Sequence, residues 1–176
     1  MDDAGMVRVT AAPARGMITL RAALDDPALA QALETGLGVK VPGQRAITRA
    51  GSAHVAWMSP DELLVMVPPA DTARVLAALR EALANSFATL ADVSDARAMF
   101  TLSGRRADEV VMKLAPVDIA RLGEAEIRRT RAAQAAVALW RSGDAEITVI
   151  CFRSVATYVQ ALLENAAAPG AALAPR

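Results

Sequence analysis

The sequence is poor in the side chains that carry most covalent and metal chemistry. It has one cysteine, Cys151, and one histidine, His54, among 176 residues. A single cysteine excludes an intramolecular disulfide, and one residue of each kind cannot supply the usual zinc ligand set. A nucleophile needs a base within hydrogen-bond reach, whereas His54 begins an apolar run and is expected to be structural or exposed. Cys151 lies in the apolar run 147–152, which favours a buried structural thiol.

Net charge and aromatic rings are also scarce. Basic and acidic residues number 19 each, so the formal net charge is zero, and aromatic residues make up 3% of the chain. No long-range field draws such a chain to a polyanion, and few rings are available for stacking on bases. We therefore expect neither a nucleic acid nor a membrane surface as a partner.

Targeting and phosphate-binding signals are missing as well. The N-terminus is acidic, no apolar run reaches membrane-spanning length, and neither G-x-G-x-x-G nor a Walker loop occurs. Gly36 and Gly38 stand at the end of an expected helix, where glycine serves as a cap. These features and the lone cysteine predict a cytoplasmic protein.

What is present is enough apolar sequence for one compact domain. The chain is 54% hydrophobic, and its mean hydropathy is +0.29, which supports a substantial core. Residues 1–15 lack periodicity and residues 166–176 are low in complexity, so both ends are expected to be flexible. A single domain is expected over residues 16–165.

The first half of this domain, about residues 16–86, shows a clear order of elements. A hairpin is the best-marked feature, since apolar runs end at Met58 and begin at Leu63 on either side of the turn from Ser59 to Glu62. Asp26 and Pro27 predict the start of a short helix reaching Leu37. The remaining elements are a strand at 17–22, the segment 44–50 and an amphipathic helix at 71–85.

The second half, about residues 89–165, repeats this order. It predicts a long strand at 90–102, a helix capped by Ser103 and stopped by Pro116, a charged loop at 118–131, strands at 135–141 and 146–152, and a last helix capped by Ser154.

The two halves align over their length. Met17 matches Met99 and Val55 matches Val137, at a common offset of about 82 residues. Each half reads β-α-β-β-α. The expected fold is therefore α+β, a duplicated unit with helices packed on antiparallel or mixed sheets. A chance match of short apolar runs is the competing explanation.

Two polar features are candidates for a site. Asp118 follows a helix and could place a carboxylate in a groove, or it could cap or solvate the next loop, which is the favoured interpretation. Arg128, Arg129 and Arg131 could hold an anion or a partner's carboxylates, although a solvated loop is favoured for them too.

Four segments resemble the gamma subunit of heterotetrameric sarcosine oxidase in order and approximate spacing, over about residues 16–165. They are residues 57–64 (Trp-Met-Ser-Pro-Asp-Glu-Leu-Leu), 92–104, 116–118 (Pro-Val-Asp) and 139–141 (Leu-Trp-Arg). The second segment also resembles the folate-binding domain of the glycine-cleavage aminomethyltransferase, a duplicated α+β fold. In that family an aspartate after an asparagine assists folate chemistry. Asp118 matches the aspartate, and Val117 stands in place of the asparagine.

The resemblance implies a noncatalytic structural subunit with no catalytic, cofactor-binding or metal residue of its own. Its partners would be the alpha, beta and delta subunits, which would carry FAD, FMN, NAD, tetrahydrofolate and zinc. The assembled enzyme would oxidatively demethylate sarcosine to glycine. A stand-alone folate-binding or one-carbon-transfer protein anchored by Asp118 is the alternative, and an RNA-associated module is a third reading. Self-association of the isolated chain is left open.

Overall fold

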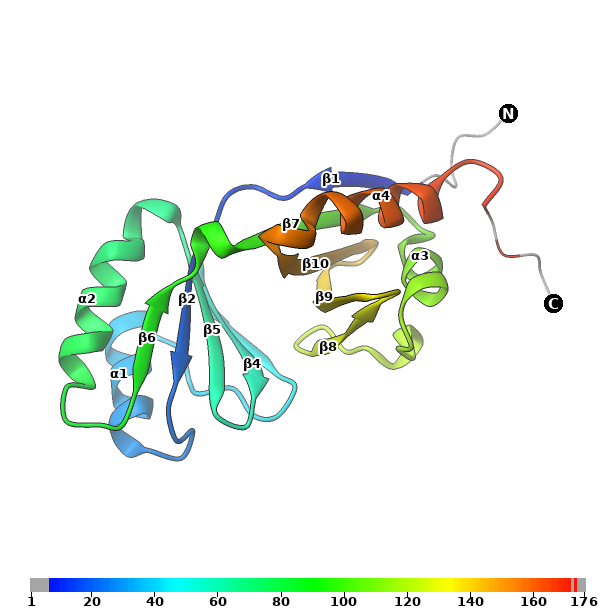
Figure 1. Ribbon diagram of the computed structural model, residues 1–176. Helices are drawn as coiled ribbons and strands as arrows, with labels where there is room; N and C mark the ends of the chain where they lie inside the picture. Colours follow the sequence, from blue (N-terminus) through cyan, green and yellow to red (C-terminus); the bar gives the residue numbers. More distant parts are fainter. Residues whose placement is uncertain (1–6, 172, 174–176) are drawn as a thin grey trace. The chain divides into compact units, whose positions relative to one another are not determined.

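The computed structural model describes residues 7–171 and residue 173. These residues form two compact units (Figure 1). Residues 14–95 make the continuous unit, and residues 7–13 together with those from 96 onward make the discontinuous unit. The repeat boundaries expected from the sequence, 16–86 and 89–165, differ from these limits. Residues 1–6, 172 and 174–176 of the ends expected to be flexible lie outside the described residues.

The continuous unit is a five-stranded sheet with helices on one face. Its strands lie in the order β3-β4-β5-β2-β6, and every neighbouring pair is antiparallel. In chain order the elements are β2 (Gly16–Arg21), α1 (Pro27–Leu37), β3 (Ile47–Ala50), β4 (Ala53–Ser59), β5 (Glu62–Val67), the 3-10 turn η1 (Pro69–Asp71), α2 (Thr72–Ala82) and β6 (Thr89–Asp92).

The discontinuous unit has the same plan. Its antiparallel sheet has the order β1-β7-β10-β9-β8. The elements are β1 (Arg8–Ala11), β7 (Arg97–Ser103), α3 (Ala107–Leu114), η3 (Ile119–Arg121), β8 (Ile127–Ala132), β9 (Ala135–Gly143), β10 (Glu146–Phe152), η4 (Arg153–Val155) and α4 (Ala156–Ala167). The turn η2 (Ser94–Ala96) lies where the chain passes from the continuous unit into β7. None of the helices in the described ranges is both long and apolar enough to cross a membrane.

The two strand orders confirm the α+β class and the duplication. Strands β3, β4, β5 and β2 correspond to β8, β9, β10 and β7, and both sheets are antiparallel. Each half has four strands rather than the three of the expected β-α-β-β-α order, because β3 and β8 are strands too. A fifth strand completes each sheet. In the continuous unit the fifth strand is β6, whereas in the discontinuous unit it is β1, which pairs with β7 from Arg8 opposite Ser103 to Ala11 opposite Phe100. Residues 8–11, in the segment expected to be flexible, are thus an edge strand.

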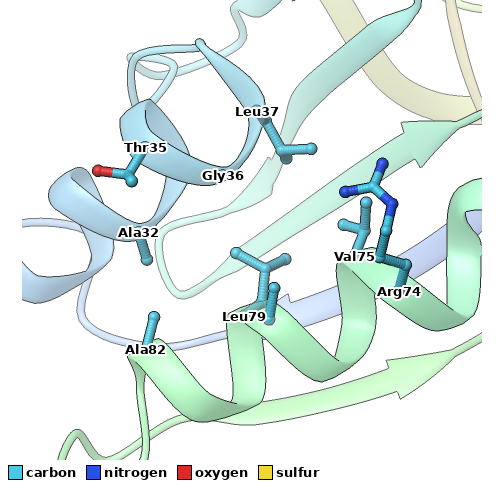
Figure 2. A pocket seen from close by; sticks show the side chains of 9 residues that line it. Ala32, Thr35, Gly36, Leu37, Arg74, Val75, Leu79 and Ala82 are labelled. Atoms are coloured by element: carbon cyan, nitrogen blue, oxygen red, sulfur yellow. The ribbon is translucent and has the colours of Figure 1, made fainter.

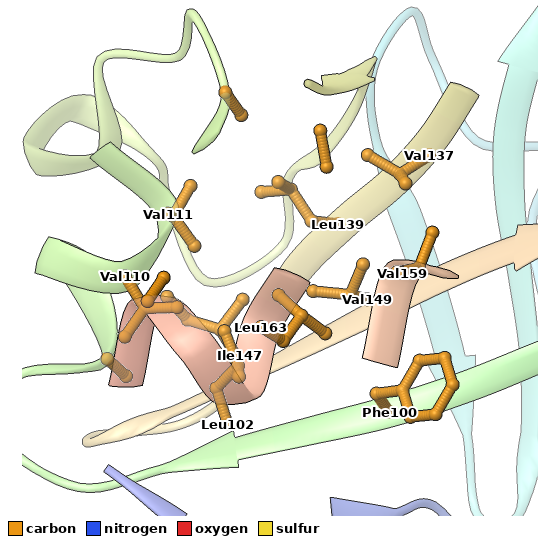
Figure 3. Close-up of a cluster of buried hydrophobic side chains, with 14 of the residues drawn as sticks. Phe100, Leu102, Val110, Val111, Val137, Leu139, Ile147, Val149, Val159 and Leu163 are labelled. Carbon is orange, nitrogen blue, oxygen red and sulfur yellow. The ribbon is translucent and has the colours of Figure 1, made fainter. Parts of the chain in front are cut away.

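Each unit has its own apolar core between sheet and helices. In the discontinuous unit, side chains of β7, β9 and β10 meet those of α3 and α4, as Figure 3 shows for Leu102, Leu139, Val110 and Leu163. The equivalent core of the continuous unit places Ile18, Leu20, Val55, Leu63 and Val65 against Leu29, Leu33, Val75 and Leu79. All six residues of β5 are buried, and the five that follow Glu62 form a continuous apolar run rather than an alternating one.

The expected hairpin and first helix are confirmed. Ser59 pairs with Glu62 across the turn at Pro60 and Asp61, so the turn is tighter than expected. The Asp26 carboxylate accepts the Ala28 N–H at 2.8 Å at the N-terminus of α1. Gly38 ends that helix with φ +68°, the left-handed conformation that glycine adopts without strain.

The strand expected over residues 90–102 is instead two strands in different sheets. The break comes at Asp92, whose Oδ1 accepts both the Ser94 N–H at 2.9 Å and the Ser94 hydroxyl at 2.5 Å. The same hydroxyl oxygen accepts the Met17 N–H at 2.9 Å. This side-chain turn competes with the sheet ladder, so β6 ends there.

Both serines expected to cap helices are placed elsewhere. Ser103 ends β7, and α3 starts only at Ala107, preceded by Arg106 without a side-chain cap. Ser154 lies in η4, and Val155 precedes α4, again without a side-chain cap. The expected stop of α3 is confirmed, because Ala115 before Pro116 is extended, with φ −131° and ψ 139°.

Candidate functional site

Asp118 lies on an exposed turn that follows α3. It precedes η3 and makes no side-chain cap to that turn. Within residues 7–171 and 173, no hydrogen bond or ion pair joins its carboxylate to another group. The carboxylate is thus presented to solvent and does not cap the turn.

Arg141 fixes the turn that follows Asp118. Its Nη1 and Nη2 donate to the two carboxylate oxygens of Asp108 at 2.9 and 2.8 Å. Its Nε donates to the Leu122 carbonyl at 3.1 Å, and Nη2 also donates to the Ile119 carbonyl at 2.9 Å. The hydrogen bonds that Arg141 donates to the Asp108 carboxylate raise the pKa of Arg141 above its usual value. We call Arg141, Asp108 and the two carbonyls the Arg141 clamp.

The clamp is a feature that sequence reasoning missed. Arg141 was noticed only as part of a resembling segment, and Asp108 was not singled out. The available signal was an arginine that ends an apolar strand run, because a part-buried guanidinium needs a carboxylate and carbonyls around it. The partners come from α3 and the η3 turn, and their convergence is a tertiary contact.

The three arginines of the charged segment lie on β8 rather than in a loop. Their side chains alternate along this strand, so Arg128 lies on the opposite face from Arg129 and Arg131. Arg128 is paired with the Glu126 carboxylate, and Arg131 donates to Gln134 Oε1 at 2.9 Å. Arg129 takes part in interactions too. The structure therefore does not gather the three side chains into one anion site.

The acidic turn of the first hairpin is only partly exposed. Glu62 is 8% exposed; it accepts the Thr19 hydroxyl at 3.0 Å and Arg21 Nη2 at 3.3 Å. Asp61 accepts Arg21 Nη1 at 3.0 Å, and a hydrogen bond from the Ser59 hydroxyl lowers the pKa of its carboxyl. Glu62 thus anchors β5 to β2.

Burial shifts the pKa values of both the histidine and the cysteine. Burial, reinforced by the charges of Arg15 and Arg49, lowers the pKa of His54 to about 4, so the imidazole is neutral at pH 7. Cys151 is 1% exposed, and burial raises its pKa, which keeps it a thiol. Among the described residues, no group of histidine, cysteine and acidic side chains is arranged to hold a metal ion.

A groove lies between α1 and α2 in the continuous unit. Its volume is about 140 Å³. Figure 2 shows Ala32 of α1 facing Leu79 and Ala82 of α2 across this space, with Arg74 at its edge. We call it the α1–α2 groove. Gly36, at the helix end, is the residue singled out in the sequence analysis that lines it, and the other walls mix buried and exposed positions of the two helices.

Sequence comparison identifies the family. The profile of the sarcosine oxidase gamma subunit family matches residues 21–169. A sarcosine oxidase subunit gamma from Corynebacterium sp. (strain P-1) is 36% identical over 119 residues, which cover 66% of this chain and 57% of that protein. One from Arthrobacter sp. is 35% identical over the same length. The chain thus spans little more than half the length of these curated relatives.

Structure comparison agrees with the sequence. The chain is similar to a chain in the structure of the heterotetrameric sarcosine oxidase from Corynebacterium sp. U-96 in complex with pyrrole 2-carboxylate, with a TM-score of 0.84, 25% identity, and coverage of 97% of this chain and 88% of that one. The glycine cleavage system aminomethyltransferase T from Bartonella henselae shares the fold, with a TM-score of 0.67 at 12% identity over 90% of this chain and 45% of that one. With a family profile matched over most of its length, the chain belongs to the sarcosine oxidase gamma subunit family.

Proposed function

We propose that the chain is the gamma subunit of a heterotetrameric sarcosine oxidase, in which it is a noncatalytic assembly subunit. The observation that carries the proposal is the agreement in fold with a chain of that enzyme over 97% of this sequence. Alpha, beta and delta subunits are its proposed partners. They would hold FAD, FMN, NAD, tetrahydrofolate and zinc and oxidatively demethylate sarcosine to glycine in the cytoplasm.

The polar side chains of the chain support a structural role. Arg141 and Glu62, which are charged and largely buried, hold backbone turns and strands together. His54 is neutral at pH 7 and Cys151 is a buried thiol. Arg141 and Glu62 thus hold the fold together, and the pKa shifts of His54 and Cys151 follow mainly from burial. Both observations suit a rigid scaffold more than a reacting centre.

Omission of the chain tests the proposal. The alpha, beta and delta subunits are coexpressed with and without it, and the complex is purified through a tag on the alpha subunit. We expect the yield of assembled, flavin-loaded complex to fall sharply without the chain and to be restored by adding it. A complex that forms and turns over sarcosine normally without this chain contradicts the proposal.

Folate binding at Asp118 is a second candidate. It is favoured by the exposed Asp118 carboxylate on a turn that the Arg141 clamp holds, in a fold shared with an aminomethyltransferase. Calorimetry with tetrahydrofolate tests it on the wild-type chain and on Asp118→Ala, with Asp144→Ala as a control at another exposed aspartate. Heat of binding that only Asp118→Ala abolishes is expected; no binding to the wild type refutes this candidate.

A further inference from the structure

We propose that the isolated chain forms a closed dimer in which Phe87 of each copy enters the α1–α2 groove of the other. The occupant of the groove is therefore a second copy of this chain. This inference concerns the continuous unit alone and does not depend on the proposed role in the oxidase.

Phe87 is the side chain that most needs a partner. It lies in the connection between α2 and β6 and is 103% exposed, so its ring contacts almost nothing in its own chain. The other large apolar side chains exposed in the described ranges are no more than 57% exposed. Phe152, one of these, is already stacked under the Arg97 guanidinium, 4.1 Å from the ring centroid. A fully exposed ring in a connection of otherwise small or polar residues is typical of an interface anchor.

The α1–α2 groove matches an aromatic ring in size and in charge. Its volume is about 140 Å³, close to the cavity of about 150 Å³ that accommodates benzene in another protein core. Apolar side chains line most of it, while the guanidinium of Arg74 stands at its rim. Arg74 Nη2 donates to Asp71 Oδ1 at 2.8 Å, which leaves the flat face of the guanidinium able to stack on an entering ring.

The position of ring and groove on one unit favours a reciprocal contact. Ala82 at the end of α2 lines the groove, and Phe87 lies a few residues later in the connection from α2 to β6. A two-fold axis beside this end of α2 would bring each ring to the other groove, which closes the assembly at two copies. The chain has zero formal net charge, so no long-range repulsion opposes the approach of two copies.

Sedimentation velocity of the isolated full chain over a concentration series tests the ring. The wild type is expected to show a monomer–dimer equilibrium, and Phe87→Ala is expected to raise the dimer dissociation constant by roughly 30-fold or more, the effect of losing an anchor residue. Tyr158→Ala is the control, because Tyr158 is also an exposed aromatic at 44% but lies on α4. Circular dichroism checks that all three proteins fold alike.

A second pair of variants tests the groove. Ala78 is exposed and lines the groove, whereas Ala73 is exposed on the same helix and does not. Ala78→Trp, which fills the groove from its own chain, is expected to abolish the dimer, and Ala73→Trp to leave it unchanged. A photoreactive benzoylphenylalanine at position 87 is expected to crosslink to α1 or α2 of the other copy.

Three results overturn the proposal. The first is a wild type that stays monomeric up to roughly 1 mM, the limit of a weak contact. The second is a dimer that Phe87→Ala and Ala78→Trp leave intact. The third is a dimer in which position 87 crosslinks to neither α1 nor α2 of the other copy, because the ring then lies outside the groove.

Discussion

Removing the Arg141 clamp should destabilise the discontinuous unit in a measurable and local way. In Arg141→Met the side chain keeps most of its apolar length but loses the donors to Asp108, Ile119 and Leu122. Two carbonyls then lack their charged donor, at about 1 kcal/mol each. Asp108 is 41% exposed and is rehydrated, so its ion pair adds only about 0.5 kcal/mol. The expected loss in the free energy of unfolding is about 2–3 kcal/mol.

Urea unfolding followed by tryptophan fluorescence measures this loss in the right unit. The two tryptophans divide between the units, with Trp57 on β4 and Trp140 on β9. In a Trp57→Phe background, the signal reports Trp140, which is 3% exposed next to Arg141. Arg121→Met is the matched control, because Arg121 is exposed in the same turn, and we expect it to change stability by less than about 0.5 kcal/mol. Equal effects of the two substitutions, or none from Arg141→Met, would refute the clamp.

Three further predictions concern titration and packing. His54, as the sole histidine, should titrate in an NMR pH series with a pKa of about 4. Because the unfolded state binds its proton near 6.5, the free energy of unfolding should fall as the pH drops from about 6.5 to about 4, and His54→Gln should flatten that fall. A measured pKa near 6.5 would be inconsistent with burial of the imidazole. Hydrogen bonds from the backbone N–H of Leu173 and then from Arg106 lower the pKa of Glu109 to about 2. Glu109 should therefore contribute stability that is present above about pH 4.3 and lost as the pH falls toward 2. If Glu109→Gln leaves the loss of stability at acid pH unchanged, this prediction is wrong. Gly16→Ala should lower the free energy of unfolding in urea by about 1–3 kcal/mol, because its Cβ would lie 1.8 Å from Thr72 Oγ1. Adding Thr72→Ala should recover part of this loss. If the losses from the two substitutions simply add, the contact with Thr72 is not the cause.

The sequence predicted the parts of the fold whose causes are local. The hairpin follows from Pro60 and Asp61 between two apolar runs, and α1 follows from Asp26, Pro27 and Gly38 at its ends. The duplication was visible because apolar runs recur at a constant offset. The hairpin and α1 depend on residues close together in the chain, and the duplication depends on a pattern that needs no tertiary contact to be read.

The parts that failed depend on competition between local and distant partners. An unbroken apolar run over 90–102 favoured one strand, but hydrogen bonds from Ser94 to Asp92 end the first strand and let β7 join the other sheet. Residues 127–132 alternate in burial as a strand, yet their arginines made them look like a loop. The partners of Arg141 and the α1–α2 groove could not be predicted, since each is made by elements brought together only in the folded chain.

The proposed role of the chain is to help assemble an oxidase without taking part in its chemistry. The most direct measurement is turnover per assembled complex after reconstitution of the other subunits with increasing amounts of wild-type or Asp118→Ala chain. We predict that assembly rises in proportion to added chain and saturates, and that turnover per complex is the same for both proteins. Loss of turnover in fully assembled Asp118→Ala complexes, or full assembly and turnover with no chain added, would contradict the claim.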